Sequence, residues 1–202
     1  MLSNFTLQKT SGFSLIELMI GIVIFAITMT YGVSSYRVWV QNTQIRNAAE
    51  SIQNGLQRAR SEAVKTNQNV FFMLGANSSW IVSPGIPPVA LPANCTNAAL
   101  LDCRLNSEGS RNVSILGFDA AGAAATTITF DNLGLVGLTP NQLNANGSQL
   151  LRQIQVDSTV LSAANSRDLV VRIGTNTAGV WAGSAIKMCD SNLAVGKPGA
   201  CS

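Results

Sequence analysis

The side chains that most often perform catalysis are sparse in this sequence. Its 202 residues include no histidine, so the commonest general base and metal ligand is absent. A two-carboxylate hydrolase or a serine–lysine pair would not need histidine, but the aspartates have no recognisable partner nearby and read as solvated loop carboxylates. No glycine-rich loop with an adjacent lysine is present to hold a phosphate. We therefore expect a protein that is not an enzyme and holds no cofactor or metal. The aspartates considered are Asp119, Asp131, Asp157 and Asp168.

One carboxylate lies in a place where a charge is costly. Residues 13–32 read FSLIELMIGIVIFAITMTYG, and Glu17 is the single charge among them. About 20 apolar residues cross a bilayer, and an ionisable group in such a segment costs about 2.5 kcal/mol or more and indicates function. A plain signal anchor would not carry this carboxylate. A cleaved secretory signal would end in a small-residue site, of which residues 26–32 offer only a weak version.

The residues around Glu17 form a specific pattern. Residues 12–18 read GFSLIEL and follow a short polar leader that contains Lys9. This pattern closely resembles the cleavage and assembly motif of type IV prepilins and of the pseudopilins of type II secretion. The resemblance implies that a membrane peptidase cuts between Gly12 and Phe13 and that the new amino terminus is N-methylated. It also implies that Glu17 interacts with the terminal amine of a neighbouring subunit during assembly.

Elementary electrostatics agrees with that role. Cleavage would place a positive amino group about one helical turn from Glu17, at positions i and i+4. Neither charge can be buried alone at acceptable cost. Docking beside another subunit lets one carboxylate pair with the other subunit's amine, so that the buried charge sets the register of the assembly.

The resemblance also implies a location and a set of partners. The partners are other major and minor pilins, the prepilin peptidase, the inner-membrane assembly platform, and the lipid bilayer before assembly. The chain would cross the bacterial inner membrane once, with a periplasmic C-terminal domain, and then enter a pilus or a pseudopilus. The positive-inside rule does not set this orientation, because Lys9 and Arg37 flank the apolar segment on opposite sides.

A long helix must present Glu17. No proline occurs between Phe13 and Thr66, and from residue 45 onwards apolar residues recur at steps of three and four. We expect a leader at 1–12, a membrane or filament-core helix at 13–33, an amphipathic half at 34–66, and a globular domain at 67–202. The sequence leaves open whether the helix kinks or melts near residues 32–35, because many relatives have a proline just after the membrane segment and this chain has none, although Gly32 still leaves a weak point. The apolar stripe is Ile45, Ala48, Ala49, Ile52, Leu56, Ala59 and Ala63.

Short strands and turns are predicted after residue 67. The fold class is therefore α+β and type IV pilin-like, a long N-terminal helix packed on an antiparallel β-sheet domain. Residues 83–112 are expected to form a loop region, and residues 175–177 a turn. A last hairpin is expected from 180–181 and 185–189. The other predicted strands are 70–74, 80–82, 113–118, 126–130, 150–156 and 169–173.

The four cysteines all follow residue 94. Four cysteines allow three connectivities, of which pairing between sequence neighbours is the simplest. A periplasmic domain makes disulfides plausible, whereas the spacing does not fit a four-cysteine zinc site. Neighbour pairing would join Cys95 to Cys103, and Cys189 to Cys201, the second pair holding the C-terminal tail.

Later features narrow the family. Several later segments resemble the FimT/FimU minor pilins and the H-type pseudopilin GspH. These segments are residues 57–63 followed by 67–70, residues 80–82, residues 128–130 with Gly134, and a late strand ending in Cys189. The favoured function is a structural minor pilin near the pilus tip that primes assembly. The alternatives are an H-type pseudopilin of a type II secretion system and a FimT-like DNA-uptake pilin.

The charge content bears on the DNA alternative. Charged residues make up 11% of the chain, hydrophobic residues 47%, and the net charge is +3. This balance excludes a disordered, highly charged chain and does not favour nucleic acid. DNA-uptake relatives carry two basic residues just before the late cysteine. In this chain the corresponding residues 184–188 hold only one, and one lysine neutralises few phosphates. The candidate DNA contacts are a small patch of Arg172, Lys187 and Lys197, with Trp181 to stack on bases.

Overall fold

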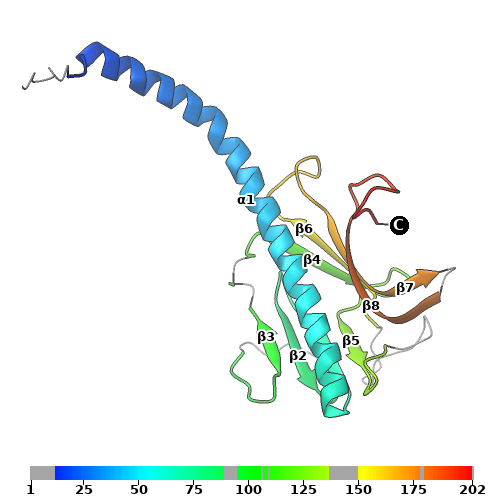
Figure 1. Ribbon diagram of the computed structural model, residues 1–202. Coiled ribbons are helices and arrows are strands. Elements are labelled where there is room, and N and C mark those ends of the chain that lie inside the picture. Colours follow the sequence, from blue (N-terminus) through cyan, green and yellow to red (C-terminus); the bar gives the residue numbers. More distant parts are fainter. Residues whose placement is uncertain are drawn as a thin grey trace, which may run out of the picture. The chain divides into compact units, whose positions relative to one another are not determined.

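A computed structural model describes residues 12–88, 95–105, 107–108, 110–136, 150–177 and 180–201. Side chains are described for these residues except 31, 32, 34, 175–177 and 180–182. Residues 1–11, including Lys9, therefore lie outside the description. A single α-helix among the described residues, α1 (Leu15–Thr66), precedes the strands (Figure 1). The strands are β1 (Val70–Leu74), β2 (Trp80–Pro84), β3 (Asp102–Arg104), β4 (Val113–Phe118), β5 (Thr127–Phe130), β6 (Gln153–Ser158), β7 (Leu169–Thr177) and β8 (Val180–Asp190).

Helix α1 has defined ends. The amide of Leu18 donates to the carbonyl of Ser14 at 3.2 Å, which makes Ser14 the cap of the first turn. At the other end Asn67 adopts a positive φ of 54°, and the amide of Gln68 donates to the carbonyl of Ala63 at 3.3 Å. This is the bond of a Schellman motif, in which asparagine replaces the usual glycine. The helix therefore ends in the segment where the sequence predicts its end.

The chain divides into two compact units, residues 1–39 and 40–202, and α1 contributes to both. In the first unit the apolar side chains of the helix are exposed. In the second unit the helix is amphipathic, and every residue of the predicted apolar stripe is at most 1% exposed, so that prediction is confirmed. Burying one such large apolar side chain stabilises the fold by about 1.5–3 kcal/mol.

Two four-stranded sheets, rather than one, form the β structure. The first has the order β3-β2-β1-β5 and the second β4-β6-β7-β8, and all pairs of neighbouring strands are antiparallel. The predicted fold, a long helix packed on an antiparallel β-sheet domain of the α+β class, is thus confirmed. The division follows from β4, which pairs with β6 and leaves β5 to pair with β1.

The main core lies where the C-terminal half of α1 meets the inner faces of the sheets. Gly55 of the helix allows close packing, because an added Cβ would lie 2.9 Å from Phe72 Cε2 and 3.0 Å from the Trp80 ring. The Trp80 indole Nε1 donates to Ser51 Oγ at 3.0 Å. Trp80 is therefore a core residue, whereas the side chain of Trp181 lies outside the described residues.

Three local predictions are wrong. Strand β3 lies within the predicted loop region, and its sequence, Asp-Cys-Arg, has no apolar alternation to reveal it. Residues 180–190 form one strand that pairs with β7 instead of a separate hairpin, with a register shift between Ile173 and Thr175. Residues 175–177 belong to β7 and are not a turn. Polar residues are tolerated at the end of β7 because its backbone pairing with β8, and not an alternation of apolar side chains, holds the end of the β7–β8 hairpin.

Candidate functional site

The predicted cleavage site is open in the structure. Phe13 is 85% exposed, and no atom lies within 4 Å of the position that a Cβ on Gly12 would occupy. Both residues precede the first residue of α1, Leu15. A peptide bond to be cleaved must fit a protease in extended form, and the Gly12–Phe13 bond lies outside the helix, so nothing in the described fold shields it.

Glu17 lies in the first turn of α1. The unsatisfied N–H groups and aligned peptide dipoles of a helix N-terminus favour a carboxylate at this position. Among the described residues Glu17 has no ion-pair partner, since the salt bridges all lie further along the helix. The carboxylate is therefore available to a group supplied from outside the described part of the chain.

An exposed apolar surface surrounds Glu17 and continues along α1 to residue 29. Large apolar side chains from residue 15 to residue 29 are each at least half exposed. One helix among the described residues, α1, is long and apolar enough to cross a membrane. This surface covers the helix on all sides, so it requires either lipid or other helices around it. Its members are Leu15, Ile16, Leu18, Met19, Ile20, Ile22, Val23, Ile24, Phe25, Ile27 and Met29.

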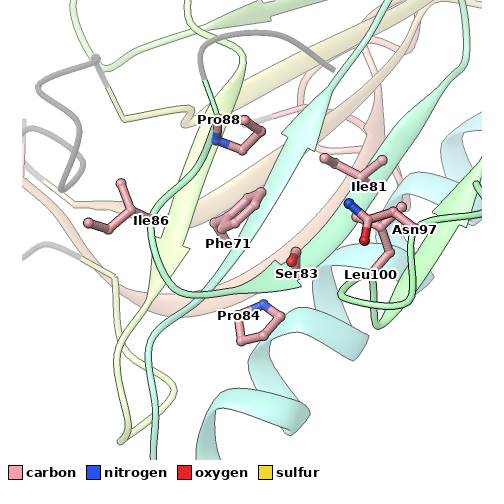
Figure 2. Close-up of a pocket in the computed structure, with 8 residues that line it drawn as sticks. All are labelled: Phe71, Ile81, Ser83, Pro84, Ile86, Pro88, Asn97 and Leu100. Carbon is pink, nitrogen blue, oxygen red and sulfur yellow. The ribbon is translucent and has the colours of Figure 1, made fainter. Parts of the chain in front are cut away.

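A disulfide joins Cys95 to Cys103, which lies in β3, with a Cα–Cα distance of 5.6 Å. The loop that it closes lies by the outer face of the first sheet, where Phe71, Met73 and Ile81 form a second apolar cluster with Leu100 and Cys103. A cavity of about 270 Å³ opens beside this cluster. Figure 2 shows Phe71 and Ile81 lining it with Ile86, Pro84, Pro88, Ser83, Asn97 and Leu100.

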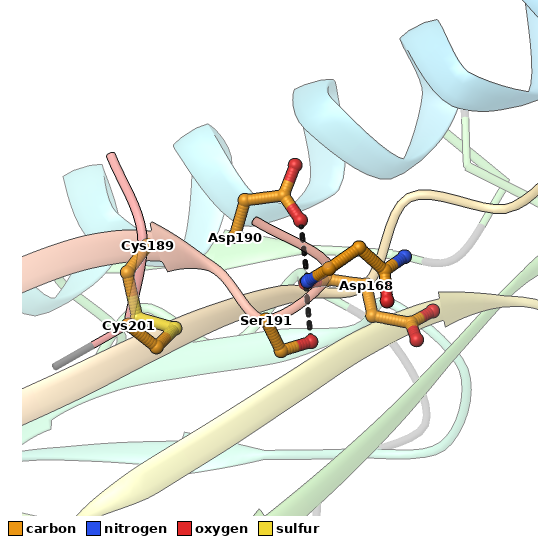
Figure 3. The surroundings of a disulfide bond; sticks show 6 residues. Asp168, Cys189, Asp190, Ser191 and Cys201 are labelled. Carbon is orange, nitrogen blue, oxygen red and sulfur yellow. Dashed lines mark hydrogen bonds between the residues drawn. A yellow bond between two sulfur atoms is a disulfide. The ribbon is translucent and has the colours of Figure 1, made fainter. Parts of the chain in front are cut away.

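A second disulfide joins Cys189 at the end of β8 to Cys201 (Figure 3). Backbone bonds support it: the amide of Asp190 donates to the carbonyl of Gly199 at 2.8 Å, and the amide of Cys201 donates to the carbonyl of Asp190 at 3.3 Å. Ser191 also donates from its amide and its hydroxyl to the carbonyl of Asp168, each at 3.0 Å. The tail is thus held to both β8 and the start of β7.

The junction between the tail and the sheet gathers acidic groups. Burial raises the pKa of Asp168, and repulsion from Asp157 and Asp190 raises it further, while Asn192 opposes the shift by hydrogen bonding. Asp157 in turn accepts a hydrogen bond from the Ser166 hydroxyl. The sequence shows the acidic residues but not this gathering, because it depends on how the tail folds back.

Acidic groups lie close to one of the three basic residues of the DNA hypothesis, Arg172. Arg172 and Lys187 lie opposite each other on β7 and β8. Arg172, however, lines a cavity of about 330 Å³ whose wall also contains Asp157 and Asp168. Lys197 lies in a turn of the tail, exposed to solvent. Charges of both signs therefore share this face, which weakens the attraction for a polyanion.

The described residues thus combine a long helix with an exposed apolar half, one carboxylate in that half, and a small β-rich domain. The family profile described as Type II transport protein GspH matches residues 48–176, and the profile of the prokaryotic N-terminal methylation motif matches residues 7–32. The chain belongs to the GspH family of minor pilins and pseudopilins.

Solved structures give more distant similarities. A crystal structure of the type IV minor pilin FimU of Pseudomonas aeruginosa (strain PAO1) has 16% identity and a TM-score of 0.40, over 66% of this chain and 86% of FimU. A second crystal form of FimU has 17% identity and a TM-score of 0.34, over 63% and 85%. A comparison with curated proteins gives no match.

Proposed function

We propose that this chain is a structural minor pilin that is cleaved between Gly12 and Phe13, waits in the inner membrane, and then enters a type IV pilus near its tip, where it helps to prime assembly. One observation carries the proposal: the apolar residues of α1 up to Met29 are exposed on all sides, while the stripe from Ile45 is buried in the chain's own domain. The first half of the helix is therefore built to pack against something else.

Assembly would exchange one set of apolar contacts for another. In lipid the apolar half-helix is surrounded by hydrocarbon, and in a filament it would be surrounded by the helices of other subunits. The exchange provides little hydrophobic gain by itself, because lipid and leucine are similarly apolar. Pairing of Glu17 with a neighbour's terminal amine would therefore supply the directional part of the interaction.

The Glu17 carboxylate also bears on where the subunit lies along the filament. A subunit that carries Glu17 leaves a buried charge unpaired unless a neighbour offers its amine. Such a subunit fits below another subunit and does not fit at the extreme end of the filament. We infer a place inside the tip complex, in contact with other minor pilins, with the peptidase and the inner-membrane assembly platform acting before incorporation.

Replacement of Glu17 tests the proposal. Glu17→Ala should leave synthesis, cleavage and membrane insertion unchanged and reduce the amount of the chain in sheared filaments by at least about tenfold, the effect of losing a charged hydrogen bond of 1.5–3 kcal/mol. Leu18→Ala, at an adjacent exposed position, is the control for simple loss of apolar area. Wild-type incorporation of Glu17→Ala would contradict the pairing role.

The family profile, whose description names type II transport, favours a second candidate, the H-type pseudopilin of a secretion system. The same helix chemistry serves both machines, so the deciding experiment is genetic. Deletion of the gene should remove surface pili and leave extracellular enzymes unchanged if the chain is a pilus subunit. Loss of secretion with normal pili would assign it to the secretion system instead.

A further inference from the structure

Two aromatic rings lie just beyond the apolar surface of α1. Tyr36 and Trp39 are each 63% exposed, and their ring centroids are 5.9 Å apart with an interplanar angle of 32°. Arg37 lies between them in sequence, is exposed, and takes part in none of the ion pairs of the described residues. Tyrosine and tryptophan are enriched at interfaces and in membrane-interface belts, where one end of the ring system is apolar and the other is wet.

The distances along the helix match a bilayer. From Leu15 to Trp39 an α-helix rises about 36 Å, and from Glu17 to Tyr36 about 29 Å. The hydrocarbon core of a bilayer is about 30 Å thick, and the headgroup regions bring the total to about 40–45 Å. When the rings lie at one boundary of the hydrocarbon, Glu17 therefore lies at the other.

The polar groups within this span support lipid as the surroundings. The Thr28 hydroxyl donates to the carbonyl of Phe25 at 2.9 Å, and the Thr30 hydroxyl donates to the carbonyl of Ala26 at 2.9 Å. Both hydroxyls are satisfied inside the helix, so they enter hydrocarbon without leaving a donor unmet. A polar partner protein is not needed to satisfy them.

We propose that Tyr36, Arg37 and Trp39, the aromatic anchor, hold the unassembled chain at the outer headgroup boundary of the bilayer. Tyrosine and tryptophan favour this boundary because one side of each ring system is apolar and the other donates hydrogen bonds. Arg37 faces headgroup phosphates there, to which a guanidinium binds well. The occupant of this surface is the lipid boundary and not a second copy of the chain.

The anchor has a consequence for Glu17. Fixing the rings at the outer boundary keeps the carboxylate at the inner boundary, where headgroups and water solvate it. A charge at the midplane would be far more costly than one at the edge. The anchor therefore keeps the subunit inserted with Glu17 accessible until a neighbour docks.

Fluorescence quenching in vesicles tests the anchor. The full chain is reconstituted in phosphatidylcholine and phosphatidylglycerol vesicles whose acyl chains carry bromine either near the headgroup or near the chain end. The emission of Trp39 is obtained as the difference between the parent and Trp39→Phe. Shallow bromines should quench this emission at least about twofold more strongly than deep ones, as expected for an interfacial ring.

Two other results would overturn the anchor. If neither brominated lipid quenches the emission, Trp39 lies in water or in protein. If the deep bromines quench more strongly than the shallow ones, Trp39 lies in the hydrocarbon. A blue shift of Trp39 emission that appears only at high protein-to-lipid ratio would indicate a second copy as the occupant. Trp39→Tyr used as a second blank should give the same difference spectrum, which guards against misfolding of the phenylalanine variant.

Lipid contact and filament assembly are separable in this design. The anchor rests on the proposed function only in taking the chain as membrane-inserted before assembly, and quenching is measured without any filament. Tyr36→Ala/Arg37→Ala, which keeps Trp39 as the reporter, should weaken the shallow quenching pattern, while Leu116→Ala/Val160→Ala, which removes exposed apolar area from the β-rich unit, should leave it unchanged. A normal quenching pattern with failed assembly would refute the pilin proposal and leave the anchor standing.

Discussion

The carboxyl group of Asp168 lies near those of Asp157 and Asp190, and burial together with their repulsion raises its pKa. A raised pKa means that the folded state binds this proton more tightly than the unfolded state. The stability that protonation provides is therefore full below the ordinary aspartate pKa of about 3.9 and is lost as pH rises through the raised value. At neutral pH the ionised Asp168 opposes the folded state.

Asp168→Asn should accordingly raise the melting temperature at pH 7 and have little effect below the ordinary aspartate pKa. The amide keeps the shape of the protonated acid and removes the repulsion. Asp119→Asn is the contrasting control, because Asp119 Oδ1 accepts from the amides of Ala121 and Ala123, each at 2.8 Å, and its charge strengthens those bonds. That variant should be less stable at pH 7, and thermal melts across pH distinguish the two. A lower melting temperature for Asp168→Asn at pH 7 would contradict the repulsion.

Gly12 is a residue whose predicted role depends on size. Nothing in the described chain crowds the position of its missing Cβ, so a substitution there should not disturb folding. The fit to the peptidase should decide the outcome instead. Gly12→Ala should leave partial cleavage, and Gly12→Leu should block it, as measured by gel mobility in cells with and without the peptidase. Cleavage of Gly12→Leu at the parent rate would contradict this site.

At the scale of the element, Gly55 decides how closely α1 approaches the first sheet. Alanine usually stabilises a helix by about 1 kcal/mol relative to glycine. Here the new Cβ would meet the Phe72 and Trp80 rings at 2.9–3.0 Å, and overpacking costs about 1–3 kcal/mol. Gly55→Ala should therefore lower the melting temperature, whereas Asn54→Ala, at an exposed neighbouring position, should raise it slightly. A higher melting temperature for Gly55→Ala would show that the rings yield easily.

An element could be predicted from the sequence only where its pattern lies within its own residues. The helix could be predicted throughout because its stripe from Ile45 repeats with the helical period and no proline interrupts it. Strand β3 could not, because three half-buried residues are ordered by pairing with β2 and not by their own preferences. The division into two sheets depends on long-range pairing of β4 with β6, which local periodicity does not contain.

The residues of the candidate site likewise fall into those that the local sequence reveals and those that it does not. Glu17 and its apolar surroundings are contiguous in sequence, so the charge in an apolar run identifies them directly. The aromatic anchor is also local, and the signal that would have found it is the pair of aromatic residues flanking Arg37 after the apolar run. The group around Asp168 is not local, because Asp157 and Asp190 reach it only after β6, β7 and the tail have folded.

At the scale of the whole molecule, the two units should respond differently to heat and to reductant. The unit from residue 40 contains the apolar core and both disulfides, whereas the helix up to Trp39 keeps its backbone hydrogen bonds within itself. In lipid or detergent such a helix resists melting, because its hydrogen bonds have no water to exchange with. Heating should therefore remove the β-sheet signal in one transition and leave about half of the helical signal of α1.

Reductant should lower that transition and leave the remaining helix unchanged. The two disulfides close loops with sequence separations of 8 and 12 residues. Each should stabilise the second unit by about 3 kcal/mol through the entropy of the unfolded chain. Circular dichroism in detergent, with and without reductant, measures both the transition temperature and the remaining helical signal. The double variant Cys189→Ser/Cys201→Ser shows how much of the stabilisation comes from the disulfide that holds the tail. Loss of all helicity in the one transition would show that the apolar half of α1 depends on the β-rich unit, and the separation into independent units would be wrong.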